Sequence, residues 1–170
     1  YQGKGQSGHM TPESRSPDLL EDAVEAGDLE AVRALLDAGA NPNTRCHAVD
    51  RAVVFVAIQR ADAEMVRLLH SFGADLRSAS SRPLLHAQAS AFDDNPLVAL
   101  LVELGWQADE QDESGWTALH HAASVGYTRN VEILLKSGAD QRVATAHGLT
   151  AADLASRNGW KDISTRLRDP

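Results

Sequence analysis

Apolar residues recur along the chain at the three- and four-residue spacing that is typical of amphipathic helices. Before Gly27 they form one stripe, made of Leu19, Leu20, Ala23 and Val24. After Asp28 they form a second stripe, made of Leu29, Val32, Leu35 and Leu36. Gly39 then stands where a left-handed residue would end the second helix. The pattern predicts a hairpin of two helices that begins at Pro17, a residue that suits the first turn of a helix.

The same pattern returns at a nearly constant interval. The glycines that close successive hairpins are 34, 32 and 33 residues apart, at Gly39, Gly73, Gly105 and Gly138. A period of this length is typical of stacked repeats, in which each hairpin buries its apolar side against its neighbours. We therefore predict five helix-turn-helix units over residues 17–169, within one domain that covers residues 17–170.

The second and third units depart most from this pattern. The second contains the run Ala52-Val53-Val54-Phe55-Val56-Ala57-Ile58, which taken alone would also suit a strand. Its position in the repeat favours a buried first helix instead. The third unit has Asp93-Asp94-Asn95-Pro96 in place of the usual glycine turn. Asn95 or Asp94 is expected to cap the following helix, with Pro96 in its first position.

The two ends of the chain differ in composition from the middle. The last helix is polar, as expected for a terminal unit that nothing covers. Residues 1–16 are rich in Gly, Ser, Gln and Pro and have no apolar period, so we predict a flexible N-terminal tail. Within it, Gly8-His9-Met10 looks like the remnant of a cloning junction, and residues 1–10 are interpreted as non-native.

The clearest unit lies at residues 112–145. It contains Gly115-Trp116-Thr117-Ala118-Leu119-His120, followed by Ala122-Ala123, Gly126 and Gly138-Ala139-Asp140. On these residues the chain resembles the ankyrin repeat family, and the second and third units are degenerate versions of the motif. The resemblance implies an all-α solenoid, in which His120 bonds to the backbone of an adjacent loop. Thr117 is placed to cap the first helix, so these motif residues are expected to form the scaffold.

Composition narrows the classes of function. The net charge of −8 is spread over both halves of the chain, so no basic module for nucleic acid is expected. No continuous apolar run has the length that a membrane span needs. Cys46 is the single cysteine, which excludes an internal disulfide framework and suits a reducing compartment. We expect a cytoplasmic monomer that contacts no membrane.

Residues that carry catalysis or bind metals are not grouped in any informative spacing. The seven histidines are dispersed, and neither Cys-x-x-Cys nor His-Glu-x-x-His occurs. Nothing in the sequence places a His and a carboxylate beside Cys46, and no glycine-rich phosphate loop has the required frame. The acidic run from Asp109 to Glu113 lacks the glycine and final Glu of a calcium loop and is interpreted as a solvated loop tip. We therefore predict no catalytic residue, no cofactor, no metal and no enzyme activity.

The resemblance implies that partners bind at positions which the motif leaves variable, in the loop tips and on the exposed edge of the first helices. In the fourth unit these positions hold Glu113, Ser114, Trp116, Ser124 and Val125. In the other units they hold Arg51, Gln59, Arg60, Arg82, His147 and Arg157. Trp116 is the favoured anchor, because an exposed Trp among polar residues is a frequent binding determinant. The alternative is that Trp116 packs on a neighbouring loop.

The predicted function is a non-catalytic module that binds a protein or peptide through its concave face. Arginines grip carboxylates in two-pronged pairs, so an acidic ligand is a reasonable partner. Two alternatives stay open. The first is an inhibitory or immunity-type protein, whose acidic tip would block a partner enzyme. The second is a regulatory fragment of a larger enzyme.

Overall fold

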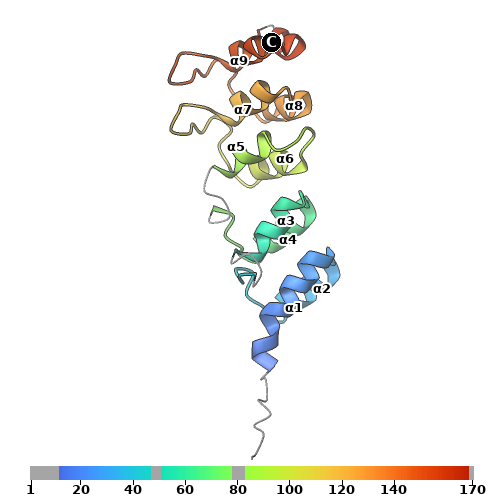
Figure 1. Ribbon diagram of the computed structural model, residues 1–170. Coiled ribbons are helices and arrows are strands. Elements are labelled where there is room, and N and C mark those ends of the chain that lie inside the picture. The colour runs from blue at the N-terminus through green and yellow to red at the C-terminus, as the bar shows by residue number, and fades with distance from the viewer. Residues whose placement is uncertain (1–11, 47–50, 78–82, 169–170) are drawn as a thin grey trace, which may run out of the picture. The chain divides into compact units, whose positions relative to one another are not determined.

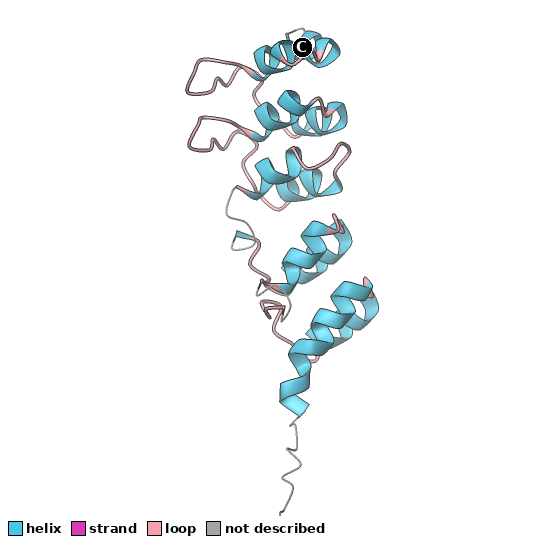
Figure 2. Cartoon of the chain, in the orientation of Figure 1, coloured by secondary structure: helices cyan, strands magenta, loops and turns pink. Residues whose placement is uncertain are grey.

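The computed structural model describes residues 12–46, 51–77 and 83–168, and in these residues the regular structure is helical (Figures 1 and 2). The helices follow one another in pairs. They are α1 (Pro12–Ala26), α2 (Leu29–Asp37), α3 (Val53–Gln59), α4 (Ala63–Ser71), α5 (Leu84–Ala89), α6 (Pro96–Glu103), α7 (Ala118–Val125), α8 (Thr128–Lys136), α9 (Ala151–Arg157) and α10 (Lys161–Arg168). The prediction of an all-α chain of five helical hairpins is confirmed.

The chain divides into two compact units, which are described separately. The first comprises residues 1–57 and 64–75, and therefore α1, α2 and most of α3 and α4. The second comprises residues 58–63 and 76–170, and therefore α5 to α10.

In the first unit, α1 packs on α2 with Leu20, Val24 and Val32 fully buried. Asp28 caps α2 by accepting a hydrogen bond from the Ala31 N–H at 2.9 Å. The first and second hairpins are joined by Asn43, whose amide donates to the Gly73 carbonyl at 3.0 Å and accepts from the Asp75 N–H at 2.8 Å. One side chain thus ties together two loops that are about 30 residues apart.

The first helix begins at Pro12, before the predicted start at Pro17. A proline is well tolerated in the first position of a helix, because the N–H that it lacks has no partner there. The apolar pattern could not show this first turn, since it contains no apolar stripe. Residues 1–11 lie outside the described residues, so the flexible tail and its non-native origin remain predictions.

The apolar run of the second helical hairpin, at residues 52–58, forms the helix α3 from Val53 onward, and not a strand. Its side chains Val53, Val54 and Ala57 are buried, which accounts for its nearly uniform hydrophobicity. In the turn that follows, Ala61 has a φ of 54°. The equivalent turn of the first hairpin, between α1 and α2, holds Gly27, with a φ of 73°. An alanine therefore adopts a backbone conformation that glycine adopts without steric cost.

In the second unit the first helices α5, α7 and α9 pack side by side in one row, and α6 packs on α8 in another. The turn between α5 and α6 replaces the usual glycine with Asp94, whose φ is 56°. Asn95 caps α6 as predicted, because its side chain accepts from the Leu97 N–H at 3.0 Å. The Asn95 N–H donates to the side chain of buried Asn130 at 2.9 Å.

The fourth hairpin, α7 and α8, has the helix cap and the hydrogen bond to the next loop that its motif implies. Thr117 caps α7, and the His120 ring accepts a hydrogen bond from the Thr117 backbone N–H at 3.1 Å. The other ring nitrogen of His120 lies 3.1 Å from the Leu149 carbonyl in the next loop. Burial lowers the pKa of His120, and this outweighs the opposing effect of the bond to Leu149. A neutral, buried His120 therefore links α7 to the loop that precedes α9, the first helix of the next hairpin.

Replacing Ala61 by Gly should raise the free energy of unfolding by about 1 kcal/mol, because the left-handed conformation costs an L-residue about that much. Urea denaturation measures the change. Ala34→Gly, on the exposed side of α2, is the control. Its free energy of unfolding should fall by about 1 kcal/mol, since glycine is a poor helix former. A loss of stability in both variants would contradict the strained turn.

Stability should fall as the pH drops through 6.5, the ordinary pKa of histidine, towards the lowered folded pKa of His120. The reason is that the unfolded chain binds the proton more tightly than the buried ring does. Urea denaturation at several pH values between about 5 and 8 measures the slope, which should be smaller in His120→Asn. A ring titration by NMR with a midpoint of 6.5 or above would overturn this assignment.

Candidate interaction surface

Two loops of the second unit, at residues 107–117 and 140–150, are bonded to each other. The Ala146 N–H donates to the Ser114 carbonyl at 3.1 Å, and the Gln111 side chain donates to both Gly115 and Ala144 carbonyls. Gly115 is required here, because a Cβ would lie 2.6 Å from the Ala146 nitrogen. The loop that carries the predicted anchor is therefore held firmly at its tip.

Trp116 lies in a group of side chains that we call the Trp116 cluster, made of Asp112, Trp116, His120 and His121. The Trp116 ring is 5.0 Å from the His121 ring between centroids, and 6.3 Å from that of His120. Asp112 accepts from the Trp116 N–H at 3.0 Å and pairs with His121 Nε2 at 3.1 Å. Trp116 is half-buried, because its ring packs on His120 and His121 while the residue as a whole stays partly open to solvent.

The electrostatics keep the Trp116 cluster ordered. Burial alone would raise the pKa of Asp112, but hydrogen bonds from the Trp116 N–H, from His121 and from the Ser114 N–H lower it below its ordinary value. Asp112 therefore stays ionised at neutral pH and continues to hold both Trp116 and His121.

His86 packs against this cluster from α5, the first helix of the preceding hairpin, which we call, like α7 and α9, an inner helix. Its ring is buried and lies edge-on to that of His121, with 5.4 Å between centroids. Its Nε2 lies 2.8 Å from the Glu110 carbonyl. Its Nδ1 is buried and has no hydrogen-bond partner in the described parts of the chain. His121 is thus packed from α5 as well as from the loop below it.

Trp160 is an exposed aromatic residue that the sequence analysis missed. Its Nε1 donates to the Ser124 carbonyl at 3.1 Å, and its side chain is 43% exposed. The ring covers Gly126, where a Cβ would lie 2.5 Å from it. Val125, beside that glycine, is also exposed. The repeat pattern marks this position, because Trp160 follows Gly159 as Tyr127 follows Gly126.

The structure brings together some of the predicted binding residues and not others. Glu113 and Ser114 are exposed beside Trp116, while Ser124 and Val125 adjoin Trp160. The remaining residues of the second unit, Gln59, Arg60, His147 and Arg157, are exposed in other turns and helix ends. Whether any of these contacts a partner remains a prediction.

Two of the predicted arginines, Arg51 and Arg82, are not among the described residues of the second unit. Arg51, in the first unit, places its guanidinium 4.3 Å from the centre of the Phe55 ring and is exposed. This is a cation–π contact within the unit itself. Arg82 lies outside the described residues.

The remaining chemical groups do not form a metal or nucleophile site in the described ranges. No group of three or more His, Cys, Asp or Glu side chains is placed there to hold a metal ion. Burial raises the pKa of the Cys46 thiol to about 11, with a further contribution from Glu21. A thiol with this pKa is almost entirely protonated at neutral pH. Among the helices of the described residues, none is both long and apolar enough to cross a membrane.

Comparison with family models gives the same repeat in both parts of the chain. A model of ankyrin repeats in three copies matches residues 85–169. A model of ankyrin repeats in many copies matches residues 20–70. The two matches include most of the degenerate second and third repeats as well as the clear fourth repeat.

Curated relatives extend the similarity. Ankyrin repeat and SOCS box protein 16 of Mus musculus is 32% identical over 162 residues, which cover 94% of this chain and 35% of that protein. The calmodulin-binding transcription activator CBT of Oryza sativa subsp. japonica is 44% identical over 71 residues, 38% of this chain and 8% of that protein. The NAD-capped RNA hydrolase NUDT12 of Macaca fascicularis is 34% identical over 82 residues, 48% of this chain and 18% of that protein.

The chain spans at most about a third of the length of these relatives, and what they have in common with it is the repeat. The helical hairpins, the Thr117 cap, the bond from His120 to the next loop and the matching family models agree. The chain belongs to the ankyrin repeat family.

Proposed function

We propose that this chain is a non-catalytic module that binds a protein or peptide partner through the inner helices and loop tips of its second unit, with Trp116 as the anchor. Ankyrin repeats generally mediate protein–protein interaction, so the family supports the general role. The specific surface is our proposal. It is carried by one observation: the ring of half-buried Trp116 packs on His121, and Asp112 holds both the Trp116 backbone N–H and the His121 ring.

Such an arrangement favours binding because the aromatic side chain is ordered before the partner arrives. Fixing a free side chain on binding costs about 0.5–1.5 kcal/mol, and this cost is reduced where contacts already hold the ring. Trp is also among the residues that most often dominate an interface, since it buries a large apolar area. Trp116 combines both properties on a loop that is itself bonded to its neighbour.

The charge around Trp116 indicates the chemistry of the partner. Glu110 and Glu113 are exposed, and their side chains make no ion pair in the described parts of the chain. Asp109 and Asp112 are instead used within the fold, the first accepting from the Asp140 N–H at 2.8 Å. We therefore propose a partner segment that places an apolar side chain on Trp116 and a lysine or arginine beside Glu110 and Glu113.

This surface does not match the earlier expectation of an acidic ligand, which rested on arginines elsewhere. Arg51 is in the first unit and Arg82 is outside the described residues, so an acidic partner for them stays a prediction. The two alternative functions also stay proposals. A role in blocking a partner enzyme would use the same Glu110 and Glu113 side chains. A role within a larger enzyme is suggested by the match to the hydrolase NUDT12, but that match covers only 18% of the relative.

The proposal is tested by capturing partners from an extract of the native host with the immobilised chain and measuring them by mass spectrometry. Trp116→Ala should reduce the recovery of specific partners by about tenfold or more, as for a dominant interface residue. The double change Glu110→Lys with Glu113→Lys should weaken capture as well, because it reverses the charge and leaves the ring in place.

The control is Lys136→Ala on α8, which is exposed and distant in sequence from the loop, and which should capture partners like the unchanged chain. Thermal unfolding of every variant checks that the fold persists. Full recovery of the same partners by folded Trp116→Ala would remove this surface as the binding site.

A further inference from the structure

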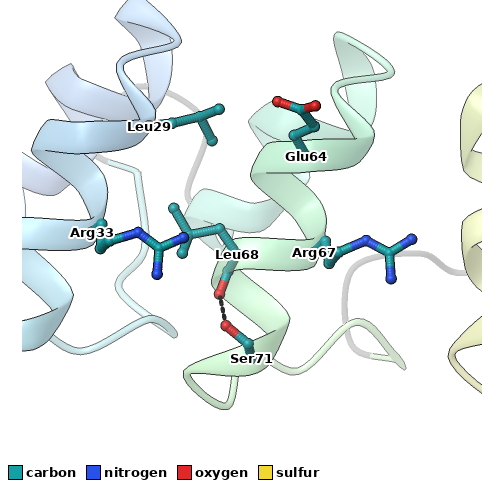
Figure 3. A pocket seen from close by; sticks show the side chains of 6 residues that line it. All are labelled: Leu29, Arg33, Glu64, Arg67, Leu68 and Ser71. Carbon is teal, nitrogen blue, oxygen red and sulfur yellow. Dashed lines mark hydrogen bonds between the residues drawn. The ribbon is translucent and has the colours of Figure 1, made fainter.

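An open groove of about 460 Å³ lies between α2 and α4 in the first unit (Figure 3). These are the second helices of their hairpins, so the groove is separate from the inner helices and from the surface proposed above. Its walls are Leu29, Arg33, Glu64, Arg67, Leu68 and Ser71. Figure 3 shows the Arg33 side chain reaching from α2 towards Leu68, while Arg67 points away from α2.

The spacing of these residues sets the length of chain that fits the groove. Glu64, Leu68 and Ser71 are four and three residues apart, so they form one stripe along α4. Leu29 and Arg33 are four apart and form the facing stripe on α2. Seven residues of helix rise about 10 Å, and an extended chain advances about 3.3 Å per residue. The groove therefore accommodates about three residues of an extended segment.

The chemistry of the groove combines an apolar floor with a free cation. Leu29 is half-buried and Leu68 is only 6% exposed, so the apolar surface below the opening comes mainly from Leu29, with Leu68 as a buried wall beside it. Arg33 is exposed and makes no hydrogen bond or ion pair in the described parts of the chain. Ser71 already donates its hydroxyl to the Leu68 carbonyl at 2.7 Å. In a chain with a net charge of −8, an unpaired guanidinium over leucines is a local site for a carboxylate.

We infer that this groove binds an extended segment of a partner protein in which an acidic residue stands between two aliphatic residues. In an extended chain the first and third side chains point to one face and the second to the other. The two aliphatic side chains then lie on Leu29 and Leu68, and the acidic side chain turns outward to Arg33. Glu64 disfavours a further carboxylate at its own end of the groove.

The test uses three short peptides, acetyl-Leu-Glu-Leu-amide and the same peptide with Gln or Lys in the centre. Each is titrated into the full chain, and the backbone amide signals of α2 and α4 are followed by NMR. The Glu peptide should bind with a dissociation constant of about 1 mM, in keeping with a short ligand in an open groove. It should bind about fivefold more tightly than the Gln peptide, because it forms a charge-assisted bond, and the Lys peptide should bind most weakly.

Two substitutions in the groove should have opposite effects. Arg33→Gln should abolish the preference for the Glu peptide over the Gln peptide, because the cation is gone. Glu64→Gln should strengthen binding of the Glu peptide by about twofold, because a like charge is removed. Lys136→Gln on α8 makes the same change in net charge as Arg33→Gln and should leave all three affinities unchanged.

The result that overturns the inference is equal binding of the Glu and Gln peptides, or a preference that survives in Arg33→Gln. Absence of any shift in α2 and α4 would overturn it as well. Circular dichroism of each variant confirms that the helices remain. Because the groove and the Trp116 cluster are different surfaces, failure here leaves the proposed function standing, and failure of partner capture by Trp116→Ala leaves the groove standing.

Discussion

The inner helices of the second unit are held by the stacking of each hairpin on the next. α7 packs between α5 and α9, and α6 packs on α8. The buried amide of Asn130, on α8, fixes the junction with the preceding hairpin of α5 and α6, because it donates to the carbonyls of Ala89 and Phe92 and accepts from the Asn95 N–H. A buried group left without its partner costs about 1–3 kcal/mol, so this junction strongly favours one register of the hairpins.

The stacking also positions the side chains available for binding. Thr117 and His120 are used to cap α7 and to reach the loop of the following unit, so they serve the scaffold. Trp116 lies next to them in sequence, yet its ring packs on His121 at the edge of the same structure. The surface therefore inherits its order from the repeat, while its specificity comes from residues that the repeat does not require.

The sequence predicted the hairpins, the Asn95 cap and the Thr117 cap because these depend on local spacing. It did not predict the role of Asn130, since its partners lie about 40 residues away in the chain. It identified Trp116 but not the His121 and Asp112 side chains that hold it, because that contact depends on how a loop folds onto α7. The sequence also did not predict the groove between α2 and α4. Helical periodicity predicts which face of a helix is buried, but not how wide the gap between two helices is.

The most direct test of the account is hydroxyl-radical footprinting of the chain alone and in complex with a captured partner. The rate of side-chain oxidation, measured by mass spectrometry, reports solvent access at each residue. Oxidation of Trp116 should fall severalfold in the complex, while oxidation of Leu135, on α8, should be unchanged. Unchanged oxidation of Trp116 together with protection of Leu135 would contradict Trp116 as the anchor. The partner would then lie on the second helices of the hairpins, such as α8.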